Sequence, residues 1–155
     1  MTNTHRTLYV SDLDGTLLNS QSVLSDYTIH KLNTLIGHHD ILFTVATART
    51  PATVTTLLKD VRARLPFIVM AGGAVWDNTL HDYTSVRTIG RDILARLLQV
   101  FCQHDVHPFV YRHHGAQIRV DHIPLMTPDE REFIMPRITT PYKTLRTPET
   151  ITADS

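Results

Sequence analysis

The sequence predicts an α/β fold with a parallel sheet in its first half and a smaller α+β unit after it. Two observations predict the first part: short apolar runs that do not alternate with polar residues, and helix-period segments between them. Such runs are typical of parallel strands buried on both faces, and strands that alternate with helices are typical of doubly wound folds. After Gly73 the pattern changes to β-hairpins around a helix. We therefore place a boundary near residues 78–84, which gives units at 1–80 and 81–155.

Three apolar runs are the predicted strands of the first unit, at residues 8–10, 41–46 and 67–71. Two helices are predicted between them. The first begins after Ser25, which can cap a helix N-terminus, and ends at Gly37, a residue type common just past a helix C-terminus. The second has Thr50 as its cap and Pro51 in its first turn, and Pro66 stops it.

The second unit is expected to alternate hairpins and helices. In chain order, we predict strands at 74–77 and near 84–86, a helix with apolar residues at 93–101, strands at 108–111 and 117–120 around a turn at 113–115, and a short helix at 129–135. No packed element is predicted beyond it, where Pro and Thr are frequent. Cys102 and Trp76 are expected in the apolar interior. Arg112 and Arg119 are expected on solvated strand faces, with contact to a phosphorylated substrate as the alternative.

Composition excludes several classes of protein. A length of 155 residues suits one domain that buries its own core. The 15 basic and 15 acidic side chains balance, so no electrostatic reason favours nucleic acid or an anionic membrane as a partner. The single cysteine excludes an internal disulfide, and no apolar run approaches the ~18 residues of a membrane span. We expect a cytoplasmic protein.

Two carboxylates directly follow the first predicted strand, in the segment Asp12-Leu13-Asp14-Gly15. Ligands of open α/β sheets bind beyond the carboxyl ends of the strands. Two carboxylates so close repel each other unless a cation or a shared proton relieves them, and Mg²⁺ prefers such oxygen ligands. The alternative is a simple turn or helix cap. A calcium-binding EF-hand loop is excluded because Gly15 is fourth from Asp12 and Val23 stands at the twelfth position.

Polar or glycine-rich segments also follow the next two strands. Thr47 and Arg49 precede a helix, where a hydroxyl, a guanidinium and free backbone N–H groups suit a phosphate. Gly72 and Gly73 follow the third strand, where backbone amides can approach a ligand. The alternatives are an ordinary threonine cap with a solvated arginine, and a tight turn at a hinge.

Together these segments resemble the haloacid dehalogenase (HAD) superfamily of phosphohydrolases. Residues 8–18 resemble its first motif, Thr47-Ala48-Arg49 resembles the second, and residues 68–77 resemble the third-strand segment of its Cof-type branch. The resemblance covers most of residues 7–121. It implies part of a HAD-like core with an α+β cap inserted after the third strand, and a phosphatase of small phosphomonoesters such as a sugar phosphate or a phosphorylated cofactor.

The resemblance also implies roles for individual residues. Asp12 would be the nucleophile that forms an aspartyl-phosphate, and Asp14 the general acid and base. Mg²⁺ would be held by the Asp12 carboxylate and the Asp14 backbone carbonyl. Thr47 would hydrogen-bond the transferred phosphoryl group, and we add Arg49 and Gly72 as phosphate-binding residues. The partner would be a small phosphorylated metabolite.

The sequence departs from the family pattern in several places. Ala48 and Gly72 replace the usual Gly and Asn. The family's third-motif lysine and fourth-motif acidic cluster are not recognisable: Lys143 is the only lysine after residue 59, and no Gly-Asp pair occurs. We therefore expect the 155-residue chain to be truncated and inactive by itself.

The sequence also allows functions other than that of a phosphatase to be considered. A non-catalytic HAD-like fragment or phosphate-binding module is the main alternative. A phospho-accepting receiver-like domain would need a further strand-end Asp and a late Lys, and neither pattern is present. A transition-metal site formed by the five histidines between residues 104 and 122 is not favoured. The chain has no second cysteine, and these histidines do not have the spacing of a zinc motif. These histidines are His104, His107, His113, His114 and His122.

Overall fold

A computed structural model describes residues 6–39, 41–138 and 141–154. The chain forms two compact units, Met1–Val86 and Arg87–Ser155. The first unit extends past the boundary expected at residue 80, because the strand Asp82–Val86 pairs with the strand before it. Among the helices of the described residues, none is long and apolar enough to cross a bilayer.

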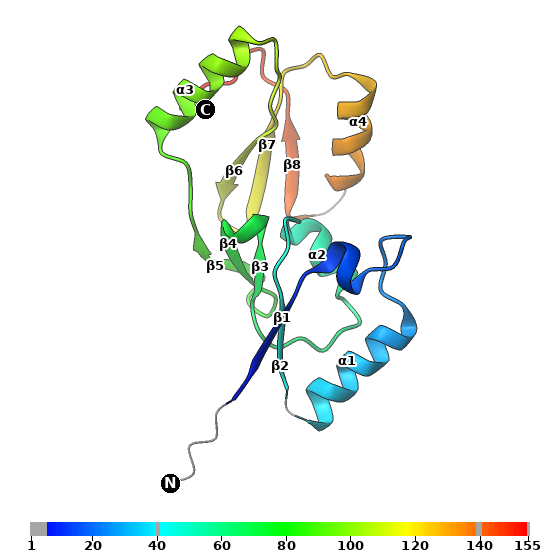
Figure 1. Cartoon of the computed structure of the whole chain (residues 1–155). Coiled ribbons are helices and arrows are strands. Elements are labelled where there is room, and N and C mark those ends of the chain that lie inside the picture. Colours follow the sequence, from blue (N-terminus) through cyan, green and yellow to red (C-terminus); the bar gives the residue numbers. More distant parts are fainter. Residues whose placement is uncertain (1–5, 40, 139–140, 155) are drawn as a thin grey trace. The chain divides into compact units, whose positions relative to one another are not determined.

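The first unit opens with two parallel strands in matched register. They are β1 (Leu8–Ser11) and β2 (Leu42–Val45) (Figure 1). A single parallel bridge between Ala46 and Ile68 then joins the end of β2 to the third strand. The parallel direction of these three strands agrees with the prediction.

The third strand also belongs to a three-stranded antiparallel sheet. Its antiparallel pairing with the next strand was not predicted. β3 (Phe67–Val69) pairs with β4 (Ala74–Asp77), and β4 pairs with β5 (Asp82–Val86). The predicted hairpin after Gly73 is therefore present. A bulge between Val75 and Trp76 interrupts its register.

Two helices lie on the same side of the β1–β2 pair (Figure 1). α1 (Asp26–His38) begins as predicted, with the Ser25 side chain capping its N-terminus. Gly37 is inside α1 and does not end it. α2 (Pro51–Leu57) begins at the predicted residue but stops well before Pro66.

The core of the first unit forms around β2, β3 and β4, while β1 stays open to solvent. Leu8, Tyr9 and Val10 are about half exposed, at 50%, 54% and 47%. The prediction that this strand is buried on both faces is wrong for the described residues, because side chains that point to both faces of β1 are about half exposed. β1 is also the end strand of its sheet. Trp76 is fully buried, as expected. The other large buried side chains are Leu13, Val45, Val54, Phe67 and Val69.

The second unit is a three-stranded sheet with two helices. β6 (Val110–His114) and β7 (Gln117–Asp121) form the predicted hairpin, although its turn lies after His114, which is part of the strand. β8 (Lys143–Arg146) pairs parallel to β7, in the stretch where no packed element was predicted. α4 (Pro128–Ile134) confirms the short helix and carries a complete capping box.

The helix α3 (Arg91–Gln103) is amphipathic but has no buried residue. Apolar side chains on it are exposed, among them Ile93 at 58% and Val100 at 49%. Cys102 is also exposed, so the expectation that it is buried is wrong. An apolar helical period predicted the helix correctly, but the period alone does not say whether a partner covers that face.

Candidate functional site

The ends of three strands in the first unit are tied together by backbone hydrogen bonds. These bonds link the segment after β2 to the end of β1 on one side and to the segment after β3 on the other. Their donor–acceptor distances are 2.9–3.0 Å: Ala46 N to Ser11 O, Thr47 N to Ile68 O, Met70 N to Arg49 O, and Ala71 N to Thr47 O. The three segments that were predicted to form a site are therefore adjacent.

Asp12 is exposed at the end of β1. Its Oδ1 accepts a hydrogen bond from the Leu13 amide at 2.7 Å, which fixes the carboxylate at the start of the following turn. No ion pair joins it to a cationic side chain of the described residues. Asp12 therefore presents an anionic oxygen to solvent, as a nucleophile or a metal ligand requires.

The turn after Asp12 brings a second carboxylate to the same edge. Residues Leu13–Leu17 form one tight turn, closed by a hydrogen bond from the Leu18 amide to the Leu13 carbonyl at 2.9 Å. Gly15 has φ +73° in this turn, a conformation that glycine adopts without steric cost. The fixed Asp-x-Asp-Gly spacing therefore has a structural reason in addition to any chemical one.

Asp14 and Arg49 form a bidentate ion pair across the two strand ends. Arg49 Nε donates to Asp14 Oδ2 at 2.8 Å, and an Nη donates to Oδ1 at 2.6 Å. The hydrogen bonds from Arg49 hold the pKa of Asp14 below its ordinary value; burial opposes this shift, and the charge of Arg49 adds to it. Asp14 is therefore ionised at neutral pH in this geometry.

Thr47, two residues before Arg49, is only 5% exposed. Its Oγ1 accepts a hydrogen bond from the Arg49 amide at 3.2 Å. The hydroxyl proton is not donated to any described residue, so it is available to an oxyanion. Thr50 was predicted to cap α2, but its side chain makes no capping bond; its buried Oγ1 has no partner among the described residues.

The segment Met70–Gly72 follows β3 with three successive positive φ angles: 54° at Met70, 53° at Ala71 and 86° at Gly72. Left-handed backbone is unfavourable for the first two residue types, and the hydrogen bonds to Thr47 and Arg49 hold it. Gly72 itself bonds to none of the other predicted site residues among those described. Space around it is open, with no atom within 4 Å of an added Cβ.

The oxygen atoms at the end of β1 fit a hard divalent cation. Mg²⁺ in proteins retains several waters and is held through one or two carboxylates. The unpaired Asp12 carboxylate supplies one such ligand, whereas Arg49 occupies both carboxylate oxygens of Asp14. Within the described residues, no group of three or more His, Cys, Asp or Glu side chains is placed to hold a metal. A cation here would therefore depend on Asp12, backbone carbonyls and water.

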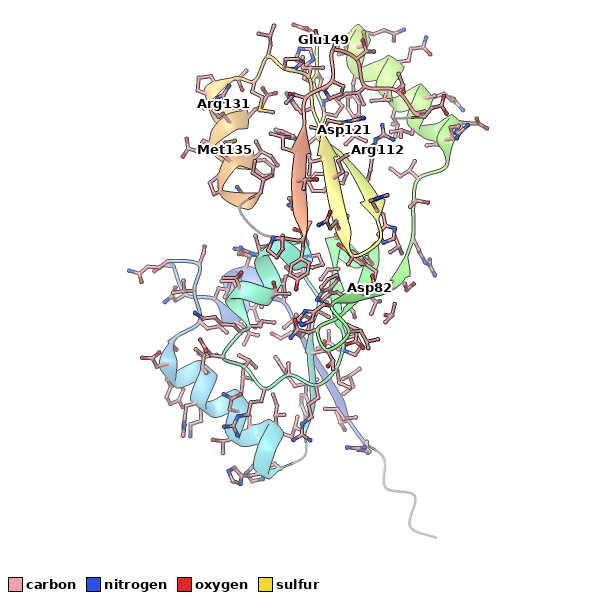
Figure 2. All side chains as sticks on the ribbon, turned by 180° about the vertical axis from the view of Figure 1, so that it is seen from behind. Asp82, Arg112, Asp121, Arg131, Met135 and Glu149 are labelled. Carbon is pink, nitrogen blue, oxygen red and sulfur yellow. The ribbon has the colours of Figure 1, made fainter. Side chains whose placement is uncertain are left out.

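A second charged cluster, which sequence reasoning missed, lies in the second unit. Asp121 is completely buried on β7, and Arg112 of β6 lies beside it (Figure 2). Arg119 of β7 and Arg146 of β8 are also within ion-pair distance of Asp121. Arg112, expected to be solvated, donates from Nε to Asp121 at 2.6 Å, and Arg146 donates two hydrogen bonds at 2.9 and 3.0 Å. Arg119 lies 3.2 Å away. The signal was the alternation of apolar with charged residues along 117–121.

Burial alone would raise the pKa of Asp121. The hydrogen bonds from Arg146 and Arg112, together with the charge of Arg119, more than offset this effect and hold the pKa below its ordinary value. Asp121 is therefore a buried carboxylate that stays ionised because guanidinium groups surround it.

A buried lysine lies on the neighbouring strand β8. Lys143 is 2% exposed, and its Nζ is 5.0 Å from the centroid of the Tyr111 ring. Burial, with a contribution from the charge of Arg137, lowers the pKa of Lys143 to about 8. No ion pair joins Lys143 to an acidic side chain of the described residues.

Comparison with known proteins identifies the family. The family model described as haloacid dehalogenase-like hydrolase matches residues 9–150. The chain belongs to this family. The match extends from the first strand through β8, so the HAD-like α/β fold expected from the sequence is confirmed. A search of curated protein sequences finds no match.

Several solved structures have the same fold at low sequence identity. A haloacid dehalogenase-like hydrolase from Bacteroides thetaiotaomicron is 17% identical, with a TM-score of 0.70 over 94% of this chain and 53% of that one. A protein from Thermotoga maritima is 16% identical (TM-score 0.66; 90% and 49% covered), and the HAD subclass IIB sugar phosphatase BT4131 is 19% identical (TM-score 0.62; 91% and 53% covered). The chain spans about half the length of these structures.

Proposed function

We propose that this HAD-family chain carries the nucleophile half of a Mg²⁺-dependent phosphomonoester hydrolase site. Asp12 is the nucleophile, Asp14 the general acid and base, and Thr47, Arg49 and Gly72 contact the phosphoryl group. The observation that supports the proposal is the joining of three strand ends by backbone hydrogen bonds. The Asp12 and Asp14 carboxylates and the side chains of Thr47 and Arg49 all belong to these joined segments.

The reaction proceeds in two displacements. A carboxylate oxygen of Asp12 attacks phosphorus, the bond from phosphorus to the ester oxygen breaks, and Asp14 gives that oxygen its proton. Water then attacks the aspartyl-phosphate while Asp14 takes the water's proton. The products are an alcohol and inorganic phosphate, and Asp12 is regenerated.

The ion pair with Arg49 decides which of these roles Asp14 can fill. An ionised Asp14 can accept a proton from water, but it has none to give to a leaving alcohol. Asp14 must therefore leave Arg49 and become protonated before the first displacement. Arg49 has a natural alternative partner in the substrate phosphate, because a guanidinium binds phosphate and carboxylate in the same bidentate manner.

A bound Mg²⁺ would neutralise charge between the Asp12 carboxylate and the phosphate. The Asp12 carboxylate and the Asp14 backbone carbonyl are the proposed ligands, with water completing the shell. The Thr47 hydroxyl, with its proton undonated within the described residues, would stabilise a phosphoryl oxygen.

The second unit is proposed as a cap that excludes water from the reaction, and the substrate as a small phosphorylated metabolite, such as a sugar phosphate or a phosphorylated cofactor. The structure BT4131 carries the name of a sugar phosphatase, which is in keeping with this substrate class. A cytoplasmic location is part of the same proposal.

Covalent labelling tests the proposal most directly. The chain is incubated with radiolabelled acetyl phosphate and Mg²⁺, and protein-bound phosphate that hydroxylamine removes is counted. The nucleophile half of the site is enough for the first displacement, even though complete turnover is not expected of these 155 residues. We therefore expect label on the parent chain, none without Mg²⁺, and none on Asp12→Asn. Asp26→Asn, an exposed carboxylate at the start of α1, is the matched control and should label normally. Label that persists on Asp12→Asn, or its absence from the parent, would contradict the proposal.

The rate at which the labelled protein loses its phosphate tests whether Asp14 is the general base. Asp14→Asn should still accept phosphate from acetyl phosphate, whose leaving group needs little protonation, but should lose the label slowly. A loss as fast as in the parent would show that Asp14 is not the base. Saturable phosphate binding with no label on any variant would favour the phosphate-binding module instead.

A further inference from the structure

The sheet of the second unit has one face on which charged side chains are neighbours. In the β6–β7 register Arg112 is directly opposite Arg119, and in the β7–β8 register Asp121 is opposite Arg146. Side chains alternate along a strand, so Arg119 and Asp121 share one face of β7. The alternate residues Ile118 and Val120 are buried, at 2% and 0% exposure, and point to the opposite face.

Asp121 is the anchor of this face. It is 0% exposed, and both of its oxygens accept hydrogen bonds from Arg146 while Arg112 binds one of them. Arg112 also donates to the backbone carbonyl of Thr152. These bonds fix the guanidinium planes before any ligand arrives, so little conformational entropy would be lost on binding.

The cluster has more positive than negative charge. Asp121 is the only acidic partner of Arg119 and Arg146 among the described residues, yet one carboxylate balances one guanidinium. Arg119 Nε is within ion-pair distance of Asp121 but makes no hydrogen bond to any described residue, and it is buried. A buried donor without an acceptor is costly, and solvent does not reach this one. A ligand would therefore bind through the N–H groups at the exposed end of the same guanidinium group.

The two arginines are also reachable from solvent. The side chains of Arg119 and Arg146 are 35% and 41% exposed, whereas that of Arg112 is 15% exposed. The anchor is therefore buried, and the outer guanidinium groups face solvent with unused donors. A planar guanidinium group can donate two parallel hydrogen bonds to the oxygen pair of a carboxylate or a phosphate.

We propose that this face of the β6–β7–β8 sheet is a binding site for an oxyanion, a phosphate or carboxylate group of an acidic metabolite, held by Arg119 and Arg146 and oriented by Asp121. The site lies wholly within the second unit. It requires neither Asp12 chemistry nor a metal, so it stands independently of the hydrolase proposal.

Nuclear magnetic resonance of the ¹⁵N-labelled chain tests this site. Inorganic phosphate and malonate are titrated separately at constant ionic strength, with chloride as the counter-titration, because screened surface attraction depends on salt alone. The backbone amides of 117–121 and the Nε–Hε signal of Arg119 are followed. We expect saturable shifts with phosphate or malonate, and the tighter of the two identifies the preferred group.

Three variants with the same loss of charge give the decisive comparison. Arg119→Gln and Arg146→Gln should each weaken binding at β7 by about tenfold or more, the contribution of one charge-assisted hydrogen bond. Arg131→Gln, on the exposed surface of α4, should bind as the parent does. Equal affinity in all three variants, or shifts no larger than those with chloride, would overturn the proposal.

The same spectra separate this proposal from the hydrolase site. Phosphate bound at the strand ends of the first unit would shift the amides of residues 12–16 and 47–49 and would be insensitive to Arg119→Gln. Shifts at β7 without covalent labelling of Asp12 would retain the oxyanion site and reject the hydrolase. Labelling of Asp12 without shifts at β7 would do the reverse.

Discussion

Arg49 holds both carboxylate oxygens of Asp14 from a loop on the neighbouring strand, at 2.6 and 2.8 Å. The pair joins the two motifs that were predicted to supply the acid–base group and a phosphate contact. In this geometry the Arg49 guanidinium uses two of its N–H groups on Asp14, and both carboxylate oxygens of Asp14 are bound to Arg49. The ion pair therefore describes a resting arrangement, in which a substrate phosphate and Asp14 would compete for the same guanidinium.

Removing Arg49 should return the pKa of Asp14 towards its ordinary value. In Arg49→Gln the two hydrogen bonds and the positive charge that lower this pKa are lost. A ¹³C titration of the Asp14 carboxyl measures the change. Arg62→Gln, which alters an exposed arginine without a charged partner among the described residues, is the control and should leave the titration unchanged. An Asp14 pKa that is identical in all three proteins would contradict the assignment.

The same ion pair should contribute little to stability. Asp14 is 52% exposed and Arg49 26% exposed, and exposed pairs contribute about 0–1 kcal/mol. Because the folded-state pKa is lowered, this small contribution is present above the ordinary pKa of aspartate and is lost as the pH falls through the folded-state value. A urea unfolding series of Arg49→Gln between pH 7 and pH 3 checks both the size and the direction.

Replacing Asp121 should have a much larger effect. Asp121→Asn leaves three guanidinium groups around a neutral side chain, and removing one partner of a buried ion pair costs about 3–5 kcal/mol. Chemical unfolding at pH 7 measures this loss. Asp105→Asn makes the same chemical change at a 97% exposed side chain and should cost less than about 0.5 kcal/mol. Similar losses in the two variants would show that the cluster does not stabilise the second unit.

The pH dependence of the free energy of unfolding is a second test of the contribution of the Asp121 carboxylate. Its folded-state pKa is lowered, so the stability it contributes is complete above the ordinary pKa of aspartate and is lost as the pH falls through the lower, folded-state value. The parent and Asp121→Asn should therefore converge in acid. A gap that stays constant down to pH 2 would mean that the carboxylate charge is not responsible.

Local sequence signals predicted most of the first unit. Apolar runs located β1, β2 and β3, and capping residues located the starts of α1 and α2. The ends of the helices were less accurate: Gly37 is inside α1, and α2 stops before Pro66 although the apolar period continues. A helix start depends on a few adjacent residues, whereas its end also depends on where the chain must go next.

The features that were missed depend on contacts distant in sequence. β8 contains Lys143, Thr144 and Arg146 and has no apolar run, so only its pairing with β7 makes it a strand. The Asp121 cluster draws its arginines from three strands. The alternation along 117–121 could put Arg119 and Asp121 on one face of a strand, but it could not bring Arg112 and Arg146 to them. Exposure could not be predicted either. The apolar run of β1 and the apolar helical period of α3 predicted both elements correctly, but these apolar side chains have little cover within the described residues.

Two glycine substitutions should change stability in opposite directions. Gly15→Ala places a Cβ on a residue with φ +73°, where no atom is within 4 Å, so its cost is backbone strain alone, about 1 kcal/mol. Gly37→Ala is the matched change inside α1, also with no atom within 4 Å, and should stabilise by about 0.5–1 kcal/mol. Thermal unfolding of both variants tests the pair. Stabilisation by Gly15→Ala would show that the turn after Asp12 does not need its left-handed residue.

Lys143→Met should stabilise the chain at neutral pH and flatten its alkaline pH profile. The pKa of Lys143 falls from 10.5 to about 8 on folding, chiefly because burial disfavours the ammonium. The unfolded chain therefore binds more protons between about pH 8 and 10.5, and the stability of the parent should rise through that window. Below pH 8 the variant avoids a cost of about 3 kcal/mol, by the relation of 1.36 kcal/mol to one pKa unit.

The two unfolding curves should approach each other as the pH rises. Above pH 10.5 the Lys143 amine is neutral in both states, so its burial no longer costs charge desolvation. Lys59→Met, at an exposed lysine, is the control and should follow the parent at every pH. Urea unfolding at pH 7, 9 and 10.5 gives the comparison. A parent whose stability stays level from pH 8 to 10.5 would mean that the Lys143 ammonium is solvated or paired, and the advantage of Lys143→Met should then vanish.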